Sequence, residues 1–255
     1  VATVLTNAEP VVWGLIGLPA LGLKDAVALS IQQFLLLVPF LLARHFLISG
    51  DSQRNLLMAI MVGGLVYSVL MLVEIRLSPQ LNMWIYGYYQ HLFGQSVRFG
   101  GYRPVVFLYH GLWVAFYTLM AMIAAWGLWR FSDMGARSHF LLAAGYLTVI
   151  LVLAKSLGAA VFAALALPIL VLVPVGWQVR IAIMIGLVAL AYPLLKGAAL
   201  IPEEYLIAQA QAIDPDRARS LEFRFQNENM LLERVQEKFW FGWGTWGRNH
   251  IIDPQ

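Results

Sequence analysis

The chain has 255 residues, of which 60% are hydrophobic and only 12% are charged. A soluble domain carries about 25% charged residues, so this composition excludes an ordinary soluble enzyme and indicates a protein embedded in a lipid bilayer. The formal net charge is only +3 and the basic residues are scattered singly, which excludes a nucleic-acid-binding protein. The absence of cysteine excludes disulfides, thiolate metal sites and cysteine nucleophiles.

Apolar stretches bounded by charged residues recur along the chain. Each approaches the length of about 20 residues that a spanning helix needs. The sequence therefore predicts an all-α, polytopic transmembrane helix bundle with about six spans, at residues 26–43, 55–73, 104–129, 138–154, 156–179 and 181–200. Lys196 interrupts the last stretch close to its end, where its side chain can reach the interface. Residues 11–23 are apolar but rich in glycine and proline, and we expect an interfacial or re-entrant piece there.

The distribution of arginine predicts the orientation in the membrane. The short loops on one side carry Arg44, Arg54, Arg130, Arg137 and Arg180. The positive-inside rule places that side in the cytoplasm. The outer side then receives residues 77–103, the corner at Lys155, and everything from residue 202 onward.

Two parts are expected from this order of segments. Residues 1–201 form the transmembrane bundle, with an aromatic first outer loop at 77–103. Residues 202–255 begin a large outer loop that we expect to continue in a longer protein. Its first helix is predicted at 203–213, and Asp214-Pro215 is typical of the start of another. That second helix is predicted to be amphipathic, because apolar residues recur at helical spacing: Leu221, Phe225, Leu232, Val235 and Phe239.

Ionisable residues gather at the outer ends of the spans, where such groups are costly and often functional. They are Glu74, Arg76, Arg98, Arg103, His110 and Lys155, with Arg224 and His250 in the last segment. For each residue alone, a snorkelling anchor is the competing interpretation. His110 lies in an apolar run and is either packed in the bundle or part of a cavity. Several arginines without matched carboxylates suit a phosphate or diphosphate, and a nearby histidine suits a general base.

Two further patterns have ordinary explanations. The aromatic residues of the first outer loop form either an interfacial belt or a surface that stacks on sugars. Asp214 and Asp216 have the spacing of a metal-binding Asp-x-Asp pair. Helix capping accounts for the same segment, so we expect no metal and no cofactor.

The residues resemble those of O-antigen ligase and of O-antigen or exopolysaccharide polymerase-like proteins. The resemblance rests on the first outer loop at 74–81, 98–107 and 110–112, on 155–160, and on 224–244 followed by His250. Leu157 stands where this family has an arginine in Ser-Arg-Gly, which leaves Lys155 as the cation expected to replace it.

The resemblance implies a metal-independent glycosyltransferase in the bacterial inner membrane, with its active face in the periplasm. The donor would be a glycan on undecaprenyl diphosphate, and the acceptor a hydroxyl of lipid A core or of another glycan. Arg103 and Arg224 are expected to hold the diphosphate, with Arg98, Lys155, Glu74 and Arg76 contributing to substrate binding. His250 or His110 is expected to take the proton from the acceptor.

A transporter or flippase of lipid-linked sugars is the alternative, because arginine-lined cavities serve both functions. A transporter places its polar groups near the middle of the membrane, whereas these residues gather at one face. A purely structural subunit would not need this concentration of arginine and histidine.

Overall fold

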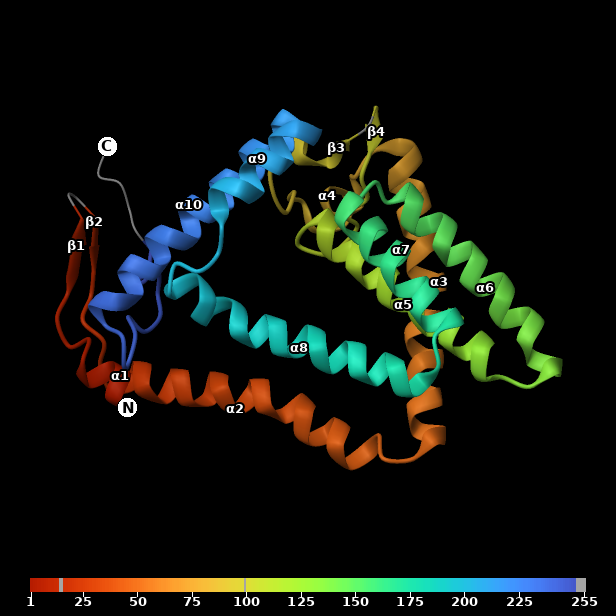
Figure 1. Cartoon of the computed structure of the whole chain (residues 1–255), viewed down its shortest axis with the longest axis horizontal. Coiled ribbons are helices and arrows are strands. Elements are labelled where there is room, and N and C mark those ends of the chain that lie inside the picture. The colour runs from red at the N-terminus through yellow and green to blue at the C-terminus, as the bar shows by residue number, and fades with distance from the viewer. Residues whose placement is uncertain (14–15, 99, 251–255) are drawn as a thin grey trace. The chain divides into compact units, whose positions relative to one another are not determined.

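The computed structural model describes residues 1–13, 16–98 and 100–250, and most of these are helical. Contacts divide the chain into two compact units, Ala43–Ile183 and the combination of Val1–Leu42 with Met184–Gln255. We call them the central unit and the terminal unit. The boundaries between the two units fall within helices α2 (Leu23–Phe46) and α8 (Val175–Gly197), which are labelled in Figure 1.

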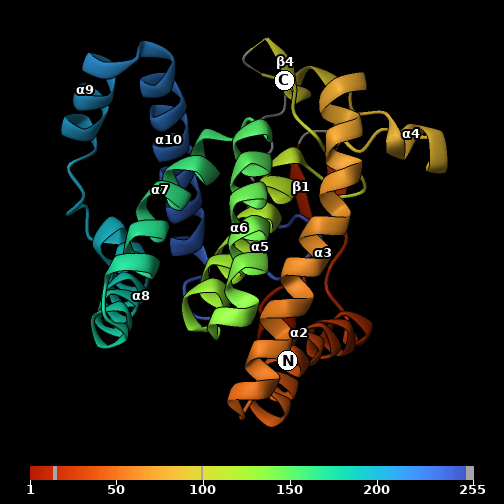
Figure 2. The same cartoon turned by 90° about the vertical axis from the view of Figure 1, so that its right-hand side faces the viewer.

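Four helices build the central unit: α3 (Gly50–Leu77), α5 (Gly111–Phe131), α6 (Met134–Leu153) and α7 (Leu157–Leu172). Helix α5 lies in the middle and packs against the other three (Figure 2). Small residues allow this close approach, since a Cβ atom at Gly64 of α3 would overlap that of Ala121 in α5. The buried core is apolar, and its members include Met71, Val114, Met122, Leu147 and Ile150.

Among the residues that the structure describes, five helices are long and apolar enough to cross a membrane: α2, α3, α5, α6 and α8. Their outward faces expose leucine, isoleucine, valine and phenylalanine, as expected of surfaces that contact lipid. The predicted all-α, multi-pass membrane fold is confirmed. Helix α7 is apolar but has only 16 residues.

Two predicted boundaries are wrong. The third span was expected to start at residue 104, but α5 starts at Gly111. The fifth span was expected to run to residue 179 and to end at Arg180, but α7 ends at Leu172 and Arg180 lies inside α8. The break occurs at Pro174, which has no N–H to donate and disfavours helical geometry in the residue before it. The last carbonyl groups of α7 instead accept hydrogen bonds from Arg130 and Gln178.

The terminal unit holds α1 (Ala2–Leu5), α9 (Glu203–Ile213) and α10 (Pro215–Glu237). Both helices predicted after residue 202 are confirmed, and Asp214 separates them. Residues 11–23 were expected to form an interfacial or re-entrant piece. They contain the antiparallel strands β1 (Val11–Trp13) and β2 (Ile16–Leu18), and their position at the membrane interface stays a prediction. These short strands are rich in valine and isoleucine, residues that favour extended backbone.

The first outer loop contains short elements of its own. They are α4 (Leu81–Tyr86), the 3-10 helix η1 (Phe93–Ser96) and the strands β3 (Val97–Arg98) and β4 (Gly101–Tyr102). The two strands pair in an antiparallel hairpin with Arg98 opposite Gly101. This hairpin positions the site described next.

Candidate anion-binding site

Glu74, in the last turn of α3, ties the first outer loop to the bundle. Its side chain is 1% exposed, and its carboxylate accepts hydrogen bonds from the backbone N–H groups of Leu81 (3.0 Å), Val105 (2.8 Å) and Val106 (2.7 Å). Val106 has a φ of 52°, an uncommon conformation for a β-branched residue. Bonds to an ionised acceptor are strong enough to hold such a backbone. Glu74 therefore positions the first outer loop, and the substrate contact predicted from the sequence stays a prediction.

Arg103 follows the β3–β4 hairpin and is 8% exposed. Its guanidinium donates one long hydrogen bond to Ser156 Oγ (3.4 Å), and its buried Nε has no hydrogen-bond partner. No carboxylate in the described ranges forms an ion pair with it. Burial lowers the pKa of Arg103, and the like charge of Arg98 lowers it further. A buried guanidinium that has no carboxylate partner among the described residues has the charge and geometry that suit an anionic ligand.

Two more cations gather around the same hairpin. Arg98 is exposed on β3, opposite Gly101. Lys155 lies between α6 and α7, and a Cβ atom added at Gly101 would overlap its Nζ. The Lys155 backbone has a φ of 50°, a left-handed conformation that costs energy for a residue with a side chain. The hairpin thus brings Arg98, Arg103 and Lys155 together, which we call the cation cluster.

His110 stands at the start of α5 as its N-cap. Its Nδ1 accepts a hydrogen bond from the backbone N–H of Leu112 (3.0 Å), so Nε2 carries the proton and donates to Gln95 Oε1 (3.1 Å). Burial lowers the pKa of His110, and the charges of Arg103, His91 and Arg98 lower it further. The lowered pKa and the N–H group that donates to Nδ1 both favour the neutral ring, in which both nitrogen atoms are engaged.

Sequence analysis missed His91, whose ring packs on that of His110 with 4.6 Å between ring centroids. Its Nδ1 donates to the carbonyl oxygen of Leu92 (2.9 Å), which leaves a lone pair on Nε2 in the neutral ring. That nitrogen is buried and has no partner among the described residues. Buried acceptors are usually satisfied, and the hydroxyl group of a ligand could donate to this one.

The structure thus brings together four of the predicted site residues: Arg98, Arg103, Lys155 and His110. Arg76 is exposed at the end of α3. Arg224 and His250 belong to the terminal unit. Both are exposed there, and His250 lines a pocket of about 290 Å³ with Asn227, Met230 and Leu231 of α10. Arg224 precedes Asn227 by one helical turn, so it lies on the same face of α10.

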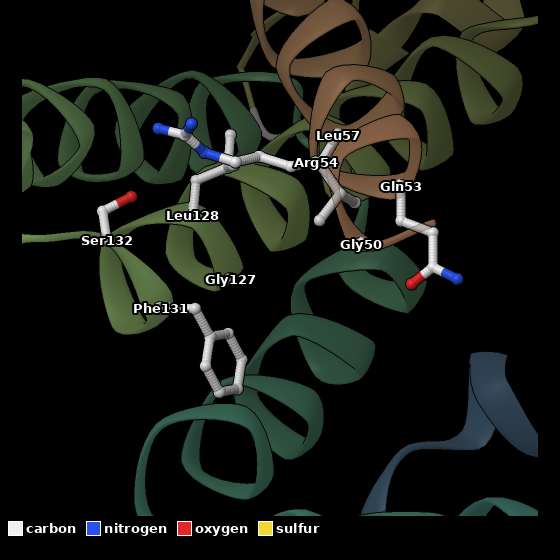
Figure 3. Close-up of a pocket in the computed structure, with 8 residues that line it drawn as sticks. All are labelled: Gly50, Gln53, Arg54, Leu57, Gly127, Leu128, Phe131 and Ser132. Carbon is white, nitrogen blue, oxygen red and sulfur yellow. The ribbon is translucent and has the colours of Figure 1, made fainter. Parts of the chain in front are cut away.

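The other end of the central unit carries a separate pocket of about 320 Å³ (Figure 3). Gln53 and Arg54 from the start of α3 and Phe131 and Ser132 from the end of α5 line it. Between the two ends, α5 contains no charged residue before Arg130. The charges of this unit are therefore concentrated at its two ends.

Within the described ranges, no group of three or more His, Cys, Asp or Glu residues could hold a metal ion. Asp214 accepts the first backbone hydrogen bond of α10 from Ala218 (3.1 Å), and the side chain of Asp216 lies outside the described residues. Comparison of the chain with protein-family models, with curated proteins and with solved structures finds no match.

Proposed function

We propose that this protein is a membrane glycosyltransferase that takes its glycan from undecaprenyl diphosphate on the periplasmic face of the bacterial inner membrane. One observation carries the proposal: Arg103, which is buried and has no carboxylate partner among the described residues, lies beside Arg98 and Lys155 at the end of the central unit that carries the first outer loop. Such a cluster suits a diphosphate, whose oxygen atoms accept several forked hydrogen bonds. The resemblance of the first outer loop to O-antigen ligases and polymerases supports the same reaction.

In this reaction the acceptor hydroxyl oxygen bonds to the anomeric carbon of the donor while the bond from that carbon to the diphosphate breaks. The diphosphate leaves with the bonding electrons, and the cation cluster stabilises the negative charge that develops. The hydroxyl proton passes to a histidine. His91 Nε2 has no hydrogen-bond partner among the described residues and can accept this proton. His110 could accept it at Nδ1 only by losing its hydrogen bond from the Leu112 N–H, which caps α5. His250, in the terminal unit, remains the alternative base.

Transport of lipid-linked sugars is the competing function. It requires polar groups along a path through the membrane, commonly near its middle. The described helices of the central unit carry their charges at their ends and none in the middle, which favours chemistry at a membrane surface instead. Positions of charge thus support the transferase over the transporter.

The test is glycan transfer from a purified undecaprenyl-diphosphate donor by the full-length protein in nanodiscs. Arg103→Ala should lower kcat/KM about a hundredfold, since removal of one such contact costs on the order of 3 kcal/mol in the transition state. Arg103→Lys should restore only part of this, because it keeps the charge and loses the forked geometry. Arg54→Ala, at the other end of the bundle, is the control. If Arg103→Ala turns over at the wild-type rate, Arg103 does not bind the diphosphate, and the transporter becomes the favoured function.

A further inference from the structure

The second half of α10 and the turn after it are fastened to the ends of two membrane spans. The first attachment is to α8. Tyr192 donates a hydrogen bond to Glu228 (2.7 Å), and buried Lys196 pairs with Glu203 at 2.5 Å. Asn229 of α10 also donates to Glu203 (3.1 Å). The middle of α10 is therefore held at the last turns of α8.

The second attachment is to the segment that leads into α2. Lys238 donates to the Thr6 carbonyl (2.6 Å), and fully buried Asn7 donates to the Gly242 carbonyl (2.8 Å). Trp246 Nε1 donates to Asp25 Oδ1 (2.9 Å) in the first turn of α2. The end of α10 is therefore held at the start of α2.

Each of these span ends is expected at a membrane surface. Helices α2 and α8 are both long and apolar enough to cross a membrane, so the start of α2 and the end of α8 are expected where a span meets the headgroups. A segment fastened to both lies at about the depth of the headgroups.

The segment between the attachments exposes apolar side chains in an ordered pattern. Leu231, Val235 and Phe239 follow at intervals of four residues and are 46%, 46% and 67% exposed. Trp240, at 84%, and Phe241, at 51%, extend this surface. Residues four apart share one helix face, so Leu231 and Val235 lie on the same face of α10, and Phe239 follows in the turn after the helix ends at Glu237. Aromatic residues next to an apolar helix face are typical of segments that lie in the membrane interface.

We infer that residues 231–241 bind the outer surface of the bilayer, with Leu231, Val235, Phe239 and Trp240 inserted among the lipids. The occupant is lipid because the segment is fastened to the ends of two spans, which themselves end at the lipid surface. The inference does not depend on the transferase function. Part of the predicted outer loop is thus a membrane-surface element rather than a freely hydrated one.

The absence of cysteine makes the test direct. Single cysteines replace Val235, Trp240 or, as the matched control on another face of α10, Glu233, in the full chain in phosphatidylethanolamine–phosphatidylglycerol nanodiscs. Each carries a nitroxide, and power-saturation spectroscopy measures its collisions with oxygen and with a water-soluble nickel chelate. Labels at 235 and 240 should collide preferentially with oxygen, and the label at 233 with nickel.

Two results would overturn the inference. Preferential nickel collisions at 235 and 240 would mean that water covers the surface. Shielding of both labels from both reagents would mean that protein covers it, either another segment or a second copy. Trp240→Phe, which keeps an aromatic ring, serves as a folding check by elution volume and helical content.

Discussion

The side chain of Arg103 lies directly against Gly111, the first residue of α5, where an added Cβ would come within 2.9 Å of both Cδ and Nε. Glycine at this position makes room for the buried guanidinium. The start of α5 therefore fixes where the charge of Arg103 is presented.

Gly111→Ala should displace the Arg103 side chain and weaken diphosphate binding about tenfold, which corresponds to about 1.4 kcal/mol. Gly127→Ala in the same helix is the matched control, because its Cβ would meet nothing within 4 Å. Binding of inorganic pyrophosphate to the nanodisc-embedded protein is measured by calorimetry. Equal affinities for the two variants would show that Arg103 does not hold the anion.

His110→Asn separates capping from base catalysis. Asparagine is a good N-cap and should keep the start of α5, whereas alanine should destabilise the protein by about 1 kcal/mol. If His91 is the base, His110→Asn should retain most of the transfer rate, and His91→Gln should lower kcat more than donor affinity. The opposite result would identify His110 as the general base. In that case His110→Asn would lose turnover with unchanged thermal stability, and His91→Gln would turn over at the wild-type rate.

The pKa of His110 is lowered by burial first and then by the charges of Arg103, His91 and Arg98. The unfolded chain consequently holds this proton more tightly. The stability that the residue contributes is present above about pH 6.5 and is lost as the pH falls toward the folded pKa.

A bound pyrophosphate should offset the charge of Arg103 and raise the pKa of His110, so protonation and anion binding should strengthen each other. Histidine-selective NMR titration with and without pyrophosphate measures this. The resonances of His139, near the start of α6, should not respond and serve as the control. A pKa of His110 that does not change with pyrophosphate would place the anion elsewhere.

Glu74→Gln should destabilise the first outer loop by about 3 kcal/mol, because the amide loses the charged acceptor and turns an N–H₂ group toward backbone donors. Asp51→Asn, exposed in the first turn of the same helix, is the control. Thermal unfolding in detergent gives the difference. If the two variants melt alike, the three backbone bonds to Glu74 do not hold the loop.

The orientation in the membrane is tested with cysteines at two open glycines, Gly94 in the first outer loop and Gly135 at the start of α6. An impermeant thiol reagent applied to intact spheroplasts should label position 94 and leave position 135 unlabelled. Labelling after lysis shows that both sites react. The reverse pattern in intact spheroplasts would invert the assignment.

The composition of the chain and the charged, proline and capping residues that bound its apolar stretches were sufficient to predict most of the helices. The length of the apolar stretches predicted the spans, and Asp214-Pro215 predicted where one helix ends and the next begins. The break at Pro174 was missed because the charge of Arg180 was taken as the end of a span. A surface arginine can lie inside a helix, as Arg180 does over the Trp177 ring, whereas proline interrupts the backbone itself.

The site was predictable only as a set of residue types at one face. Which of them meet depends on contacts that no local pattern encodes. The pairing of Arg98 with Gly101 brings the cations together, and the packing of the His91 ring on that of His110 places His91 beside them. The carboxylate of Glu74 looked available for substrate because its backbone partners lie in a distant loop.

At Lys155 the residue that best suits the left-handed backbone differs from the residue that supplies a positive charge. Glycine at this turn would relieve the strain, so Lys155→Gly should preserve or raise the melting temperature while it removes a cation from the cluster. Lys155→Ala would keep the strain and lose the charge as well. At the turn between α6 and α7, glycine would therefore favour stability, whereas lysine favours anion binding by the cation cluster.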